Sequence, residues 1–221
     1  MTHIFYTSIH EKNHSRLMNE FSIDFPENYR NKIKAFRRWQ DAQLSLLGRY
    51  LLKYGLKSIQ KEFYPNNLKF NSNSKPYLDA ENLEFNISHS GNIVVCAISD
   101  RYEIGIDIEI LKDIDIMDFR GQMTQNEWNK VIYSNNISSS FFNYWTQKEA
   151  VLKAHGSGII DVLKSFEIID NGTKLNKSYF FIKEIFIDYG YKCHMAFKEK
   201  MDSNIFEPKY INSLELIEAS H

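Results

Sequence analysis

The stretch of residues 104–110 constrains the fold more than any other part of the chain. Its sequence alternates isoleucine with Gly105, Asp107 and Glu109, and this period of two predicts a β-strand. The isoleucines would occupy one face and the two carboxylates the other, roughly 6.5–7 Å apart along the strand. That spacing suits two ligands of one hard cation, and Gly105 would leave room beside them. The alternative is a half-buried strand whose acidic face is solvated.

Composition limits the classes of protein to which the chain can belong. It has 221 residues, 43% of them hydrophobic, which is enough for a sizeable core. The net charge of −1 gives no general positive field for nucleic acid. The start lacks a signal-peptide pattern, and the longest apolar run, residues 93–98, is too short to span a bilayer. We therefore expect a cytoplasmic protein that binds neither nucleic acid nor membrane.

The two cysteines, Cys96 and Cys193, have neither CxxC nor zinc-site spacing. Each lies in an apolar run that resembles a strand. We therefore expect buried structural thiols.

The N-terminal half predicts a strand at 3–9, a short helix at 11–20 and a long amphipathic helix over 34–54 that ends at Gly55. Gly48 inside the long helix predicts a close packing contact. The front of that helix is basic, with Arg30, Lys32, Lys34, Arg37 and Arg38. This cluster is either a solvated helix face or a patch that binds one or two phosphates of a nucleotide.

Residues 84–98 predict a hairpin, two strands joined by a tight turn near Ser88, His89 and Ser90. Their hydroxyl and imidazole groups could cap the turn or bind a ligand. A Ser-His nucleophile pair is not expected, because neighbouring residues on a strand point to opposite faces.

A second candidate segment is the predicted helix over 141–154. In it Glu149 and Lys153 are neighbours at i and i+4, which could be an ordinary surface ion pair. Alternatively, Glu149 completes a metal site with Asp107 and Glu109, and Lys153 meets an anion beside it. A neighbouring stripe, expected to be core, consists of Phe141, Trp145, Lys148 and Leu152.

The remaining segments complete an α+β pattern. A capping box, Thr124-x-x-Glu127, predicts the start of one helix, and Gly156 is expected to end the helix over 141–154. An antiparallel meander should follow, with strands at 165–169, 179–187 and 191–197 and a turn at 171–172. The tail from residue 201 is expected to be loosely attached. Each half combines helices with antiparallel strands, which predicts two similar lobes, residues 1–104 and 105–221.

Four motifs stand in a specific order along the chain. They are Lys75-Pro76, Phe85-Asn86-Ile87-Ser88-His89-Ser90-Gly91, Gly105-Ile106-Asp107-Ile108-Glu109 and Trp145-Thr146-Gln147-Lys148-Glu149-Ala150-Val151-Leu152-Lys153, followed by Gly156-x-Gly158. Each is weak alone, but their order and spacing resemble the 4′-phosphopantetheinyl transferase superfamily, of the large surfactin-synthetase-activating (Sfp-like) type. The resemblance extends over about residues 1–200.

This resemblance implies a monomer of two pseudo-symmetric α+β lobes, each with helices packed on a small, mostly antiparallel sheet, with coenzyme A bound between them. It also implies transfer of the 4′-phosphopantetheine arm from coenzyme A to a serine of an apo acyl or peptidyl carrier protein. The reaction would depend on Mg²⁺ and release adenosine 3′,5′-bisphosphate.

The resemblance also assigns roles to residues. Asp107, Glu109 and Glu149 would hold Mg²⁺, and Glu149 and Lys153 would be catalytic. Glu149 could accept the serine proton directly or through a metal-bound water, and both routes stay open. The expected coenzyme A contacts are Lys32, Lys75, Ser88, His89, Lys148 and Lys153.

One departure from the family is Leu44, which stands where many relatives carry arginine. It weakens the expected phosphate contacts at the adenosine end, and Arg37, Arg38 or Lys53 could compensate. Residues 121–140 match no motif, although relatives meet the carrier protein in this region.

Two other functions remain as alternatives. The acidic residues with lysine could form a Mg²⁺-dependent nuclease or phosphodiesterase, although such an enzyme needs a basic groove that the composition does not favour. The chain could also be a non-catalytic module that binds carrier proteins.

Overall fold

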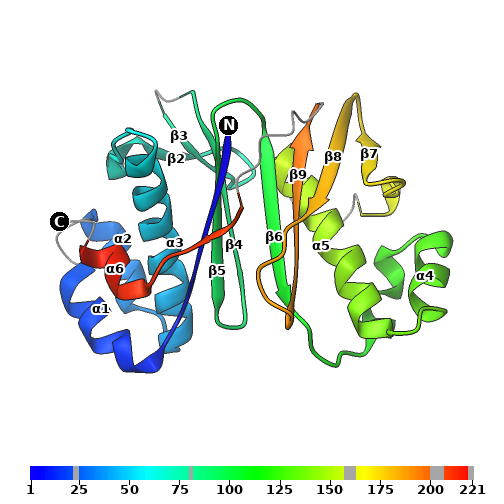
Figure 1. Cartoon of the computed structure of the whole chain (residues 1–221), viewed down its shortest axis with the longest axis horizontal. Coiled ribbons are helices and arrows are strands. Elements are labelled where there is room, and N and C mark those ends of the chain that lie inside the picture. Colours follow the sequence, from blue (N-terminus) through cyan, green and yellow to red (C-terminus); the bar gives the residue numbers. More distant parts are fainter. Residues whose placement is uncertain (22–24, 80–81, 157–162, 200–206, 219–221) are drawn as a thin grey trace. The chain divides into compact units, whose positions relative to one another are not determined.

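The computed structural model describes residues 1–21, 25–79, 82–156, 163–199 and 207–218. The chain forms two compact units, the first from residues 1–71, 76–101 and 204–221, the second from residues 72–75 and 102–203. Each unit packs a long helix on a four-stranded sheet (Figure 1). Every strand pair but one is antiparallel among the described residues, so the predicted α+β fold is confirmed.

The sheet of the first unit has the strand order β10-β1-β5-β4. Its strands are β1 (Thr2–Ser8), β4 (Glu84–Ser90), β5 (Ile93–Ser99) and β10 (Lys209–Tyr210). The predicted hairpin is confirmed as β4 and β5, and a positive φ of 53° at Gly91 makes its tight turn possible. Both cysteines are buried and free, as expected, and burial raises the pKa of each thiol.

The helices of the first unit differ from the prediction. They are the short 3₁₀ helix η1 (Glu11–Asn13), α1 (His14–Glu20), α2 (Glu27–Lys34), α3 (Trp39–Ser58) and α6 (Ser213–Glu218). The single helix predicted over 34–54 was wrong, because α2 ends at Lys34 and α3 begins at Trp39. The basic cluster is therefore divided between α2 and the turn that follows it.

The two glycines of α3 explain where this helix packs. Gly55 does not end α3, because it lies against the sheet, where an added Cβ would overlap side-chain atoms of Phe5 and Ile98. A Cβ at Gly48 would stand 3.0 Å from Ile87, which confirms the predicted close contact. A glycine inside a helix costs only about 1 kcal/mol relative to alanine, so tight packing can retain it.

The described part of the tail, residues 207–218, is firmly attached to the first unit. Strand β10 pairs in parallel with β1, and α6 buries Leu216 and Ile217 completely. Asn13 Nδ2 also donates a hydrogen bond to Ser213 Oγ at 3.1 Å. The prediction of a loose tail was wrong for these residues, because their apolar side chains gain free energy from burial. The division at residue 104 stays a prediction, and the first compact unit differs from it by including the tail.

A small hairpin completes the first unit. It consists of β2 (Leu68–Phe70) and β3 (Pro76–Leu78) and follows the 3₁₀ helix η3 (Pro65–Asn67).

The second unit contains the predicted central strand and the meander, in the order β6-β9-β8-β7. Its strands are β6 (Ile104–Ile110), β7 (Gly172–Leu175), β8 (Ser178–Glu184) and β9 (Tyr191–Lys198). The strand predicted at 165–169 was wrong, since this segment begins with the end of η5 (Leu163–Ser165) and makes only an isolated bridge at Ile169.

The helices of the second unit are η4 (Ile116–Gln122), α4 (Gln125–Ile132) and α5 (Ile137–His155). The capping box of Thr124 and Glu127 is confirmed, and α5 ends at Gly156, whose φ is 73°. The motif residue Gly158 lies outside the described residues. None of the helices in the described ranges is long and apolar enough to cross a membrane.

Helix α5 packs across β6 and β9 and approaches the backbone of β6 closely at Gly105. A Cβ at this position would collide with the carbonyl oxygen of Ala150 and the amide nitrogen of Ala154. Gly105 therefore permits a close strand–helix contact that a larger residue would prevent.

Candidate active site

The acidic face of β6 is turned toward α5. Gly105, Asp107 and Glu109 alternate with the isoleucines, and the contact of Gly105 with α5 identifies the face that they share. Asp107 is only 4% exposed and Glu109 is half-buried. The alternative of a solvated acidic face is therefore wrong for Asp107.

Helix α5 brings a lysine and a third carboxylate to this face. Lys153 Nζ lies 2.6 Å from Asp107 Oδ1 and also donates to the carbonyl oxygen of Ile106 at 3.3 Å. Glu149, one helical turn earlier, is 7% exposed. Its burial does not fit the alternative of an ordinary surface ion pair.

The charges around Glu149 indicate that these groups form one cluster. Burial raises the pKa of Glu149, the Lys153 ammonium lowers it, and the carboxylates of Asp107 and Glu109 raise it further. Such charge effects act over short distances in a partly buried site. The structure thus pairs Lys153 with Asp107, and it sets Glu149 near enough to both of them and to Glu109 for their charges to act on its pKa.

The side chains of the cluster are not arranged as the ligands of a single metal ion. In the part of the chain that the structure describes, no three His, Cys, Asp or Glu side chains are arranged to share a metal ion. Lys153 instead holds one oxygen of Asp107. The donor chemistry nevertheless fits a hard divalent cation, because these are carboxylate oxygens whose mutual repulsion a cation would relieve.

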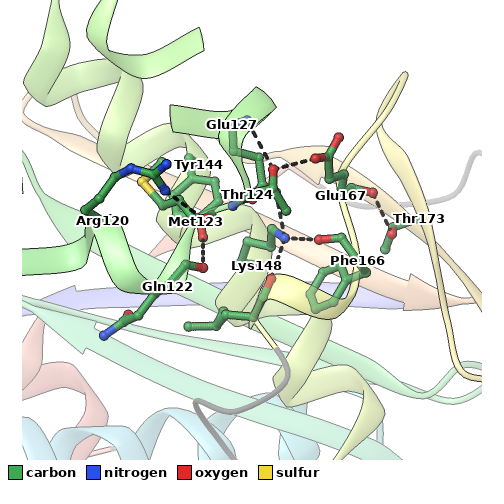
Figure 2. Close-up of polar contacts among 11 residues, drawn as sticks. Arg120, Gln122, Met123, Thr124, Glu127, Tyr144, Lys148, Phe166, Glu167 and Thr173 are labelled. Atoms are coloured by element: carbon green, nitrogen blue, oxygen red, sulfur yellow. Dashed lines mark hydrogen bonds and ion pairs between the residues drawn. The ribbon is translucent and has the colours of Figure 1, made fainter. Parts of the chain in front are cut away.

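Lys148 points elsewhere, and its predicted contact with coenzyme A is not supported. The side chain is 0% exposed and is surrounded by partners (Figure 2). Its ammonium lies 2.6 Å from Glu127 Oε1 and donates to the carbonyl oxygens of Leu163, at 2.8 Å, and of Phe166. Because the ammonium is completely buried among these partners, a phosphate of a bound coenzyme cannot reach it. Burial lowers the pKa of Lys148, and Glu127 acts against this shift.

His194 is a buried group that the sequence did not single out. It lies on β9 opposite Asp107, and its Nδ1 is 2.7 Å from Thr146 Oγ1. The Thr146 hydroxyl donates its single hydrogen to the carbonyl oxygen of Phe142, so His194 Nδ1 must be the donor to Thr146. Burial lowers the pKa of His194 to about 4, which keeps the ring neutral at neutral pH.

In the first unit, Lys32 is exposed on α2 and lines a pocket of about 390 Å³. Arg49 and Lys69 are the other basic residues of this pocket. Leu44, the departure from the family pattern, is buried in the core. The sequence missed Arg49 and Lys69, because only the fold brings α2, α3 and β2 together around this pocket.

The other predicted coenzyme contacts lie in different surroundings. Ser88 is buried and His89 exposed on β4, and as strand neighbours they point to opposite faces. Lys75 belongs to the second unit, where its Nζ lies 3.5 Å from the carbonyl oxygen of Ala154 near the end of α5.

Comparisons with known proteins identify the chain's relatives. Residues 103–200 match the family described as the 4′-phosphopantetheinyl transferase superfamily, and residues 15–101 match the family "4′-phosphopantetheinyl transferase, N-terminal". The 4′-phosphopantetheinyl transferase gsp of Aneurinibacillus migulanus is 39% identical over 178 residues, which are 74% of this chain and 73% of the relative. The chain belongs to the 4′-phosphopantetheinyl transferase superfamily.

Further relatives are of the same kind. The transferase Sfp of Bacillus subtilis (strain 168) is 32% identical over 157 residues, 68% of this chain and 69% of the relative. The transferase HetI of Nostoc sp. is 36% identical over 143 residues, 61% of this chain and 55% of the relative. The predicted resemblance to Sfp-like transferases is confirmed. The chain is thus an enzyme of this type, and not the nuclease or the non-catalytic module.

Proposed function

We propose that this phosphopantetheinyl transferase acts as a monomer and uses coenzyme A and Mg²⁺ to modify a serine of an apo acyl or peptidyl carrier protein. The serine oxygen forms the new bond to phosphorus, and adenosine 3′,5′-bisphosphate leaves with the electrons of the broken bond. The observation that supports this most is the cluster of Asp107, Glu109, Glu149 and Lys153 between β6 and α5. Its acidic and basic groups suit a diphosphate and its counter-ion.

Asp107, Glu109 and Glu149 would hold the magnesium ion, which when bound neutralises charge on the diphosphate. The chain itself contributes the ammonium of Lys153, fixed beside this group by Asp107. A positive charge held there stabilises the negative charge that develops on the departing phosphate.

Glu149 is our candidate for the group that takes the serine proton. The Glu149 carboxylate is buried, at 7% exposure, and could take the proton directly or through a metal-bound water. The same burial keeps bulk water from competing for this carboxylate.

Coenzyme contacts outside the cluster remain part of the proposal. We assign Lys32, Lys75, Ser88 and His89 to the phosphates of coenzyme A, because ammonium, hydroxyl and imidazole groups all pair with phosphoryl oxygens. Arg49 and Lys69 line the same pocket as Lys32 and can supply the positive charge that Leu44 lacks. Lys148 is left out of this set because of its burial.

The proposal is tested by the intact mass of a panel of fatty-acid, polyketide and peptide carrier proteins. With coenzyme A and Mg²⁺, one or more carriers should gain roughly 340 Da, the mass of one transferred arm. With EDTA the gain should disappear, and excess Mg²⁺ should restore it. No gain on any carrier would contradict the transfer to carriers, and an equal gain in EDTA would contradict the need for metal.

A further inference from the structure

Lys148 and Glu149 are neighbours in sequence, but α5 turns them to different sides. Glu149 faces the carboxylates of β6, whereas Lys148 reaches Glu127 on α4 and two carbonyl oxygens of the segment that follows α5. Figure 2 shows the Lys148 side chain ending between Glu127 and Phe166. Successive residues on a helix are about 100° apart, so fixing one of them also fixes the direction of the other.

Helix α5 is held from two sides around Glu149. On the sheet side, Gly105 allows backbone atoms of Ala150 and Ala154 to press against β6. On the other side, the three contacts of Lys148 attach the same turn to α4 and to residues 163–166. Neither contact touches the carboxylate of Glu149, but together they restrict rotation and sliding of the helix that carries it.

The contacts of Lys148 continue into a connected polar network. Glu127 Oε2 accepts a hydrogen bond from the Thr124 backbone at 3.0 Å, and the Thr124 hydroxyl donates to Glu167. The Glu167 carbonyl oxygen accepts from Thr173 at 2.7 Å. The network therefore joins α4, α5 and the start of β7 through partners whose geometry is directional.

We propose that Lys148 is a positioning residue, which acts with Glu127 to hold Glu149 in the catalytic cluster and does not contact coenzyme A. This inference rests on the proposed function. Stability alone is a weak explanation for the buried pair, because apolar residues of similar size often stabilise a core as well or better. The ion pair, together with the two hydrogen bonds of Lys148 to carbonyl oxygens, instead selects one arrangement of the helix. Displacement of a reacting group by about 1 Å can cost roughly a hundredfold in rate.

The test uses the double variant Lys148→Met/Glu127→Gln in the full-length chain. Removing both charges avoids leaving one ion buried and alone. The introduced glutamine side chain retains an oxygen for the Thr124 backbone, so the capping box can persist. The matched control is Val151→Ala, which makes a cavity on the buried side of α5 and removes no atom that contacts Lys148.

Three quantities are measured, namely kcat for carrier modification, the Kd for coenzyme A, and the Kd for Mn²⁺ in the presence of coenzyme A. We expect the double variant to lose about 10–100-fold in kcat and in Mn²⁺ affinity, as for other groups that orient metal ligands. Its affinity for coenzyme A without metal should stay within about twofold, because Lys148 is enclosed. Val151→Ala, at a similar melting temperature, should keep kcat and Mn²⁺ affinity within about threefold of the wild type.

The outcomes separate the inference from the proposed function. A loss of coenzyme A affinity with kcat unchanged would make Lys148 a coenzyme contact and overturn the inference. Wild-type kcat and Mn²⁺ affinity in the double variant, or equal losses in Val151→Ala, would overturn it as well. A wild-type protein that modifies no carrier would refute the proposed function, and with it the inference.

Discussion

Lys153 Nζ lies 2.6 Å from Asp107 Oδ1 and joins the last turns of α5 to the middle of β6. This ion pair lies beside Glu149, whose pKa responds to both partners in opposite directions. The lysine offsets part of the repulsion among three carboxylates while no cation is bound. It also fixes the ammonium group that we propose to contact the diphosphate.

Single substitutions in this pair should move the pKa of Glu149 in opposite directions. Asp107→Asn removes a negative neighbour and should lower the pKa, whereas Lys153→Gln removes a positive neighbour and should raise it. Titration of the Glu149 carboxyl carbon by NMR, in the absence of metal, measures both shifts. A pKa that responds to neither substitution would mean that the four groups do not form one cluster.

Gly105→Ala should separate β6 from α5. The added methyl group would collide with backbone atoms of Ala150 and Ala154, and such overpacking typically costs about 1–3 kcal/mol of unfolding free energy. Because the same contact sets the distance between the acidic groups, carrier modification should fall by about tenfold or more. The matched control is Gly121→Ala, since a Cβ at Gly121 meets no atom within 4 Å. Equal behaviour of the two variants in urea unfolding and in turnover would contradict this packing argument.

His194 should make the fold sensitive to acid. Its pKa is about 4 in the folded protein, below the ordinary value of 6.5, so protonation favours the unfolded chain. The stability that it contributes is complete above about pH 6.5 and is lost as the pH falls toward 4. Asn at this position keeps a donor for Thr146 but cannot take up a proton.

When the pH falls from about 7 to about 4, the unfolding free energy of His194→Asn should therefore decrease by about 2–3 kcal/mol less than that of the wild type. Urea unfolding at both pH values measures the difference. The same acid-induced loss in both proteins would show that the buried ring does not titrate as we expect.

The tail should contribute substantially to the stability of the first unit. Leu216 is completely buried, and Leu216→Ala should cost about 2–5 kcal/mol of unfolding free energy, whereas Glu215→Ala on the less buried side of α6 should cost little. Thermal unfolding compares the two variants. Similar melting temperatures would indicate that α6 is not packed on the unit.

Features that depend on local patterns could be predicted from the sequence. The alternation of residues 104–110 predicted β6, and the spacing of Thr124 and Glu127 predicted a capping box. The i, i+4 pair placed Glu149 and Lys153 on one helix stripe. The motif order then connected these segments, although nothing local fixes how β6 and α5 meet.

Features that depend on contacts distant in sequence were missed. Gly55 was predicted to end the helix, but packing against Phe5 and Ile98 carries α3 past it. The register that sets His194 opposite Asp107 is decided by the whole sheet. Lys148 was predicted to contact coenzyme A, and neither its burial nor its partner on α4 could be read from spacing.

The most direct test of the catalytic cluster is Glu149→Gln. Because the raised pKa of Glu149 means that the folded state holds its proton more tightly, the stability from this group is lost as the pH rises through that pKa. A neutral glutamine should therefore not lower the melting temperature at neutral pH. The variant can then be compared with the wild type as a folded protein.

The decisive measurement is the single-turnover rate at which a modified carrier appears by intact mass, with coenzyme A and Mg²⁺ at saturation. Our account predicts that Glu149→Gln lowers this rate by about a hundredfold or more, the usual contribution of a positioned general base. A folded variant whose rate stays within about threefold of the wild type would contradict the role of Glu149 and the site built around it.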